Sequence, residues 1–227
     1  MGARLLFVCT GNVCRSPIAQ HLLAARLEHP AWLEIASAGT HAPTGHAMAG
    51  EAAILAREYG AREVDGDRHR ARAMVPALVE QADLVVTMTR AHRRGAVEAA
   101  PRRLRQTFTL REFARVACSI DAQELARVAD AAADASPEER LRALVALVGE
   151  RRPQTPAPAD PDDDDIVDPF GEDDAVYRRC ADQLLPALDH VERILRVAAA
   201  TTPPLAPERR ATRAQRRLAR DRARGAE

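Results

Sequence analysis

The feature that most constrains the fold of this sequence is a short apolar run that leads directly into a loop of eight residues. The run Arg-Leu-Leu-Phe-Val at 4–8 predicts a buried strand, and the loop Cys-Thr-Gly-Asn-Val-Cys-Arg-Ser follows at 9–16. Pro17 suits the first turn of a helix, whose apolar side continues to about residue 28. This order predicts an α/β fold with the loop at the carboxyl end of a strand, where such folds bind ligands.

The same alternation continues along the chain. Strands are predicted at about 32–39, 83–88 and 104–109, and helices at about 47–59, 74–81, 90–100 and 110–116. Strands that alternate with helices are typical of a parallel sheet covered on both faces, with right-handed crossovers.

The second half of the chain is less regular. Its periodicity predicts amphipathic helices at 125–133 and 137–148, a Pro-rich loop at 151–161 and a long helix at about 173–199. Residues 205–227 have almost no apolar content. We therefore predict one domain at 1–200, with a helical and loop insertion at about 117–162, and a disordered Arg-rich tail at 201–227.

Composition narrows the function classes. Hydrophobic residues are 46% and charged residues 29%, as in globular proteins, and a net charge of zero gives no general attraction to nucleic acid or membrane. Four irregularly spaced cysteines predict no disulfide framework, and neither a signal peptide nor a membrane-spanning segment is predicted. We expect a cytoplasmic protein, a monomer or weak dimer. The acidic run at 160–165 is expected to stay solvated; the alternative is that it binds a divalent ion. The basic tail is also expected to stay solvated; the alternative is that it binds nucleic acid or acidic lipid.

The loop at 9–16 predicts phosphate chemistry. A Cys-x5-Arg spacing alone is weak here, because all 33 basic residues are arginine, but its position between a strand and a helix N-terminus favours an anion site. Arg15 is expected to grip phosphoryl oxygens, and the positive surroundings favour a Cys9 thiolate as nucleophile. Ser16 is expected to hydrogen-bond the sulfur. The alternative is an ordinary βα turn with a buried thiol. The remaining predicted phosphate-binding residues of the loop are Thr10, Gly11, Asn12, Val13 and Cys14.

A thiolate that attacks a phosphate ester also needs an acid for the leaving oxygen. Asp168 in Ile-Val-Asp-Pro-Phe-Gly is our candidate, because it lies on a turn after an apolar pair and Pro169 restricts its backbone. The alternative is a plain Asp-Pro turn that ends an acidic loop.

Taken together, these motifs resemble the low-molecular-weight protein tyrosine phosphatases. The similarity covers about 3–116 and 163–197, and its motifs lie at 9–19, 37–40, 69–72, 82–88 and 168–169. The resemblance implies a four-stranded parallel sheet, a phosphocysteine at Cys9, oxyanion stabilisation by Arg15, and Asp168 as acid and then base. It implies no metal or other cofactor. It also implies that His69 supports the loop asparagine, and that Cys14 can form a protective disulfide with Cys9.

The sequence departs from this family at the cleft walls. Residues 41–45 lack the usual aromatic residue, and Phe170 stands where the family commonly has tyrosine. His41 and His46 are predicted to be exposed loop residues. We expect a phosphatase for phosphotyrosine, on a phosphorylated protein, or for a small aryl phosphate. The alternatives are a thioredoxin-coupled arsenate reductase, for which Cys118 and Cys180 lie too far apart in sequence, and a non-catalytic phospho-ligand binder.

Overall fold

The computed structural model describes residues 2–131 and 135–200. Its core is a sheet of four parallel strands in the order β2-β1-β3-β4, which confirms the predicted fold class. The strands are β1 (Ala3–Cys9), β2 (Leu33–Gly39), β3 (Leu84–Thr87) and β4 (Thr107–Thr109).

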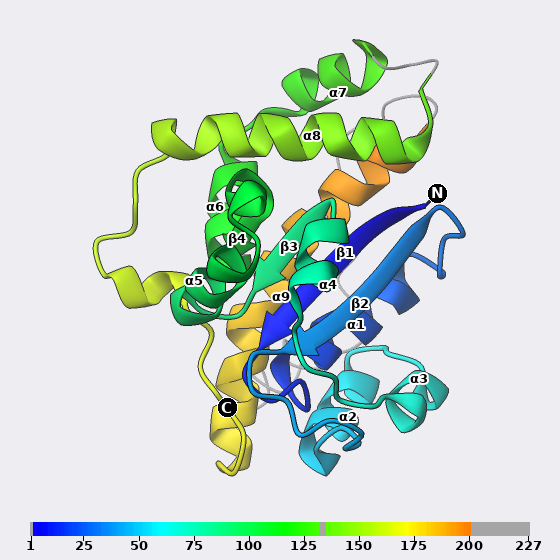
Figure 1. Cartoon of the computed structure of the whole chain (residues 1–227), viewed down its shortest axis with the longest axis vertical. Coiled ribbons are helices and arrows are strands. Elements are labelled where there is room, and N and C mark those ends of the chain that lie inside the picture. The colour runs from blue at the N-terminus through cyan, green and yellow to red at the C-terminus, as the bar shows by residue number, and fades with distance from the viewer. Residues whose placement is uncertain (1, 132–134, 201–227) are drawn as a thin grey trace, which may run out of the picture.

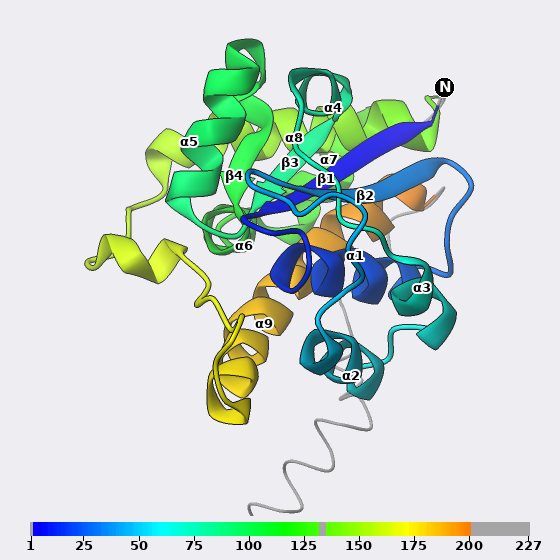
Figure 2. The ribbon, with the colours of Figure 1, turned by 60° about the horizontal axis from the view of Figure 1, so that its bottom comes forward.

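Helices cover both faces of this sheet (Figures 1 and 2). Their bounds are α1 (Arg15–Arg26), α2 (Gly50–Glu58), α3 (Glu63–Arg68), α4 (Pro76–Gln81), α5 (Arg90–Ala99), α6 (Leu110–Cys118), α7 (Ala122–Ala131), α8 (Pro137–Arg151) and α9 (Asp174–Ala199). Short 3₁₀ segments lie at Pro101–Gln106, Arg152–Gln154 and Pro161–Asp164.

Alternate residues of β1 point to opposite faces of the sheet and build two separate cores. Leu5 and Phe7 belong to the larger core, which α1, α6, α8 and α9 complete. Leu6 and Val8 belong to a smaller core under α4 and α5. Because β1 is buried on both faces, its carboxyl end at Cys9 has a fixed position. The loop that follows therefore starts from a fixed point.

Two local predictions differ from the structure. Only Thr107–Thr109 is a strand; the predicted first half of that strand is a 3₁₀ helix, because Pro101 starts a turn that continues to Gln106. Helix α3 was not predicted, since it buries none of its residues and therefore carries no apolar periodicity. The helix predicted at 125–133 is observed as α7, and its last two residues, like the tail at 201–227, lie outside the described residues.

The segment between α6 and α9 extends away from the predicted phosphate loop. Figure 1 shows α7 and α8 at the end of the molecule opposite the carboxyl ends of β1 and β2. The guanidinium of Arg152, just after α8, stacks 3.6 Å from the centre of the Phe108 ring, and burial lowers the pKa of Arg152 to about 10. The chain then returns through the acidic run to the carboxyl edge of the sheet. In the described part of the chain, no helix combines the length and apolar character needed to cross a membrane.

Candidate active site

The loop at 9–16 joins the end of β1 to the start of α1. Backbone contacts fix its first residues: the N–H of Thr40 donates to the carbonyl of Cys9, and the N–H of His41 to that of Thr10, both at 2.9 Å. The side chain of Cys14, the N-cap residue of α1, makes no capping hydrogen bond. The N–H groups of the first helical turn therefore remain available for an anion at the positive end of the helix dipole.

Asn12 holds the loop in shape through all of its polar groups. Its φ of +54° is left-handed, so Asn12 rather than Gly11 makes the sharp turn. Its side-chain Nδ2 donates to Ser16 Oγ (3.0 Å) and Ser37 Oγ (2.7 Å), and its Oδ1 accepts the backbone N–H of Arg72 (3.0 Å). Because Asn12 is fully buried, each of these bonds is needed to offset its desolvation.

Two buried histidines support Asn12 from behind. The Nε2 of His69 lies 2.8 Å from the backbone carbonyl of Asn12, and a carbonyl only accepts, so this nitrogen carries the proton. The Nδ1 of neutral His69 then accepts from the Nε2 of His21, 3.4 Å away. Burial is the main cause that lowers the pKa of both imidazoles, that of His21 to about 4. The resemblance implied that His69 supports the loop asparagine; in the structure His69 contacts the backbone carbonyl of Asn12.

The sulfur of Cys9 lies on the floor of the loop. The backbone N–H of Asn12 donates to it at 3.2 Å, and the Ser16 hydroxyl lies 3.0 Å away. Since Ser16 Oγ already accepts a hydrogen bond from Asn12, its proton is free to point at the sulfur. Two donors aimed at one sulfur can stabilise the negative charge that a leaving sulfur atom acquires.

Arg15 brings the distant Asp168 to the loop. One terminal nitrogen of Arg15 donates to Asp168 Oδ2 at 2.5 Å, and the other donates to the carbonyl of Ile166 at 3.1 Å. The Arg15 side chain is almost completely buried, whereas half of the Asp168 side chain is exposed. The Nε of Arg15 is buried without a hydrogen-bond partner among the described residues. The guanidinium thus ties the carboxylate to the edge of the loop and retains a donor for a ligand.

A further histidine, which sequence reasoning missed, contacts the loop from α5. His92 Nε2 lies 2.8 Å from the hydroxyl of Thr10, and its Nδ1 lies 2.9 Å from the hydroxyl of Thr89, the N-cap residue of α5. Burial, and next the charge of Arg15, lower the pKa of His92 to about 4, so the ring is neutral near pH 7. No sequence signal distinguishes His92 from an ordinary residue in the first turn of a helix.

The second loop cysteine faces the core. Cys14 is buried, its sulfur lies 3.8 Å from the hydroxyl of Tyr177 on α9, and burial raises its pKa to about 12. Cys14 is therefore a thiol near neutral pH. All four cysteines are free in this structure, and the predicted Cys9–Cys14 disulfide stays a prediction.

The mouth of the site has few apolar walls. His41 and His46 are exposed, as predicted. Phe170 is 64% exposed, and its backbone N–H donates to Asp168 Oδ1 at 3.3 Å. An exposed aromatic ring two residues from the carboxylate offers a surface for a flat substrate group.

The fold and this loop are those of a phosphatase, and comparison with known proteins identifies the family. The profile of the "Low molecular weight phosphotyrosine protein phosphatase" family matches residues 4–154. The chain belongs to this family and is an enzyme of that class. The matched range ends before Asp168, so the position of Asp168 beside the loop comes from the structure.

Individual relatives agree with this assignment. A "Protein-arginine-phosphatase" of Geobacillus stearothermophilus is 36% identical over 113 residues, which cover 50% of this chain and 72% of the relative. A "Probable low molecular weight protein-tyrosine-phosphatase EpsP" of Ralstonia solanacearum is 34% identical over 109 residues, 48% of this chain and 71% of the relative. The solved "YwlE arginine phosphatase" of G. stearothermophilus superposes with a TM-score of 0.57 at 27% identity, over 86% of this chain and 93% of that one.

Gly39 at the end of β2 leaves room for the loop at 9–16, so adding a methyl group there should lower both the stability and the activity. A Cβ at Gly39 would lie 2.4 Å from the carbonyl oxygen of Thr10 and 3.0 Å from the N of Asn12. We expect Gly39→Ala to lower the free energy of unfolding by about 1–3 kcal/mol and to reduce phosphatase activity, because backbone has to move. Gly50→Ala is the matched control, since nothing lies within 4 Å of its added Cβ. Equal stability and activity of the two variants, by urea unfolding and ester hydrolysis, would contradict this account.

The buried histidines make stability depend on pH. His21 and His92 have a folded pKa of about 4 against an ordinary value of 6.5, so between these pH values the unfolded chain binds protons that the folded chain does not. The free energy of unfolding is therefore highest above pH 6.5 and falls toward pH 4, by about 3 kcal/mol per histidine at most. We expect His92→Gln to lose less stability than wild type between pH 7 and 4.5 in urea unfolding. An equal loss in both would refute the His92 contribution.

Proposed function

We propose that this chain is a protein phosphatase that hydrolyses phosphotyrosine or aryl phosphate monoesters through a phosphocysteine intermediate. The observation that carries the proposal is the meeting of Cys9, Arg15 and Asp168, since Asp168 lies 153 residues after Arg15 in sequence yet contacts its guanidinium. The proposed nucleophile and the arginine that binds the anion lie in one loop, and the proposed proton donor contacts that arginine; phosphoryl transfer to a thiolate requires all three groups.

In the first step the loop binds the phosphoryl dianion. The loop N–H groups and Arg15 donate to its oxygens, and these oxygens compete with Asp168 for the guanidinium. The sulfur of Cys9 forms a bond to phosphorus while the bond from phosphorus to the ester oxygen breaks. Asp168 gives its proton to that oxygen, which leaves as an alcohol or phenol.

In the second step water hydrolyses the phosphocysteine. Asp168, now a carboxylate, takes a proton from the attacking water, and the new oxygen–phosphorus bond replaces the bond from phosphorus to sulfur. Cys9 leaves as a thiolate that the Ser16 hydroxyl and the Asn12 N–H stabilise, in keeping with their distances of 3.0 and 3.2 Å.

Phosphotyrosine is the first candidate substrate, and phosphoarginine is the second. The family and the relative in R. solanacearum support the first. The relative in G. stearothermophilus, named a protein-arginine-phosphatase, supports the second. A planar group of either kind fits the exposed Phe170 ring beside Asp168.

Two matched phosphopeptides test this choice. One peptide sequence carrying either phosphotyrosine or phosphoarginine is offered to the enzyme, and phosphate release is followed with each. We expect the higher kcat/KM on phosphotyrosine. A higher kcat/KM on phosphoarginine would establish the second candidate, and no release from either peptide would contradict the proposed function.

We further propose that the enzyme works in the cytoplasm on phosphorylated proteins, as a monomer or weak dimer. A reducing compartment suits a chemistry that depends on a free Cys9, and the four cysteines are free in the structure.

A further inference from the structure

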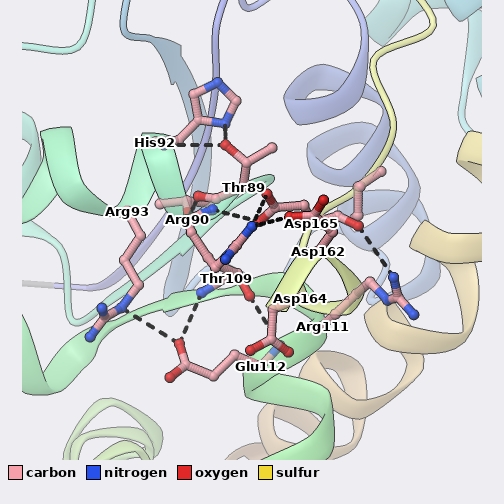
Figure 3. A network of polar contacts seen from close by, with 12 residues as sticks. Thr89, Arg90, His92, Arg93, Thr109, Arg111, Glu112, Asp162, Asp164 and Asp165 are labelled. Carbon is pink, nitrogen blue, oxygen red and sulfur yellow. Dashed lines mark hydrogen bonds and ion pairs between the residues drawn. The ribbon is translucent and has the colours of Figure 1, made fainter. Parts of the chain in front are cut away.

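The acidic run before Asp168 is anchored to the protein at its end: Asp162 and Asp163 stay exposed, as expected of a solvated run, whereas Asp164 and Asp165 are largely covered. Its last four aspartates each face an arginine of α5 or α6 (Figure 3). The side chains of Asp164 and Asp165 are only 15% and 28% exposed. The pairs are Arg90 with Asp162 and Asp165, Arg111 with Asp163, and Arg115 with Asp164.

Arg90 makes the most extensive of these contacts. As the first residue of α5, it donates its backbone N–H to Asp165 Oδ1 at 2.7 Å. Its guanidinium adds bonds of 3.3 Å to both oxygens of Asp165 and also reaches Asp162. Arg90 therefore binds the acidic run at two residues, which fixes the direction of the run as well as its distance from α5.

The backbone between Asp165 and Asp168 is held at every step. The N–H of Ile166 donates to the carbonyl of Met88 at 2.8 Å, and the N–H of Val167 donates to Gln183 Oε1 at 2.9 Å. The side chain of Ile166 is buried. The Asp168 carboxylate is therefore placed by these contacts together with the point at which Asp165 holds the start of the segment.

The same helical turn also contacts the phosphate loop. His92 on α5 reaches the hydroxyl of Thr10. Arg90, two residues earlier, reaches Asp165 (Figure 3). The first turn of α5 thus touches the loop of the nucleophile on one side and the segment of the proton donor on the other, and it sets the spacing between them.

We propose that Arg90 is a positioning residue for the proposed acid Asp168, and that it acts through Asp165. The inference rests on the proposed function and adds to it. Exposed ion pairs contribute little to stability, and the side chain of Arg90 is 44% exposed. The guanidinium contact therefore matters for geometry: Arg90→Gln keeps the backbone N–H bond to Asp165 and leaves the fold intact, but it frees the acidic run to shift, and the direction of the Asp168 carboxylate toward the leaving oxygen shifts with it.

Leaving-group dependence tests this role. Para-nitrophenolate leaves readily without a proton, whereas phenolate needs one, so a misplaced acid harms phenyl phosphate more. We expect Arg90→Gln to reduce kcat/KM for phenyl phosphate on the order of tenfold and for para-nitrophenyl phosphate by about twofold. Arg142→Gln is the matched control, since the Arg142 side chain is 51% exposed and pairs with Asp83, which lies just before the amino end of β3. The control should leave the ratio of the two kcat/KM values unchanged.

Combined variants separate this role from a general structural effect. If Arg90 acts through Asp168, Arg90→Gln has no further effect on phenyl phosphate once Asp168→Asn is present. Competitive inhibition by inorganic phosphate should stay as in wild type, because the loop itself is unaltered. Asp165→Asn should shift the ratio in the same direction, and it provides the test should Arg90→Gln fold poorly.

Three results would overturn the proposal. They are an unchanged leaving-group ratio in both Arg90→Gln and Asp165→Asn, an additive loss in the Asp168→Asn background, and a loss of phosphate inhibition equal to the loss of activity. A wild-type protein that hydrolyses neither ester would overturn the proposed function as well, whereas an active wild type with an unchanged ratio overturns only the role of Arg90.

Discussion

Cys9→Ser is expected to reduce hydrolysis of para-nitrophenyl phosphate by about 10⁴-fold or more. A serine hydroxyl at this position stays protonated, because the groups of the described residues that hydrogen-bond the sulfur are a hydroxyl and an N–H, and neither is a base. Both stabilise an anion but remove no proton. The fold should be unaffected, because the exchange of sulfur for oxygen is nearly isosteric, and the variant should still bind inorganic phosphate through Arg15 and the loop.

Cys118→Ser is the control for this variant. Cys118 is exposed at the end of α6, and its replacement should leave the rate unchanged. Substantial activity in Cys9→Ser, or a loss in Cys118→Ser of similar size, would mean that the nucleophile is elsewhere. The second outcome would also revive the arsenate-reductase alternative, in which additional cysteines carry the chemistry.

Asp168→Asn is expected to have the next largest effect, because an amide neither donates an acidic proton nor accepts one from water. General acid catalysis contributes about 10²–10⁴-fold, so we expect a loss in this range for phenyl phosphate and a smaller one for para-nitrophenyl phosphate. The change also removes a negative charge from Arg15, the residue that Asp168 contacts at 2.5 Å. Phosphate should therefore bind at least as tightly as in wild type.

Asp130→Asn, an exposed aspartate on α7, controls for the loss of a carboxylate. Steady-state rates on both esters, with phosphate as inhibitor, distinguish the outcomes. An Asp168→Asn variant that hydrolyses phenyl phosphate as fast as wild type would exclude Asp168 as the acid.

The part of this architecture that lies close together in sequence was predictable. The buried run of β1, the turn and Pro17 specify a strand, loop and helix through local propensity, and the position of Cys9 at the carboxyl end of the sheet follows. Only the resemblance suggested the role of His69. His69 lies 57 residues after Asn12, and local sequence does not predict which residue of such a distant segment contacts the Asn12 carbonyl.

The contacts of the acidic run show where sequence reasoning fails. Consecutive aspartates are normally solvated, and that expectation fails for Asp164 and Asp165, because Arg115 on α6 and Arg90 on α5 cover them. Arg115 lies one turn after Arg111, which pairs with Asp163. The i, i+4 spacing was visible in the sequence. The pairing of these arginines with the acidic run was not visible, because all 33 basic residues are arginines and local sequence does not show which of them face the run.

The most direct test of the central claim is to find the phosphoryl group on Cys9 during turnover. Wild-type enzyme is mixed with para-nitrophenyl phosphate, quenched rapidly, digested with trypsin and analysed by mass spectrometry. Cleavage after Arg4 and Arg15 gives the peptide 5–15, which contains both loop cysteines, and fragment ions assign the modified one. We predict a phosphoryl group on Cys9 and none on Cys14. Turnover with Cys9 unmodified, or with the phosphoryl group on another residue, would contradict the account.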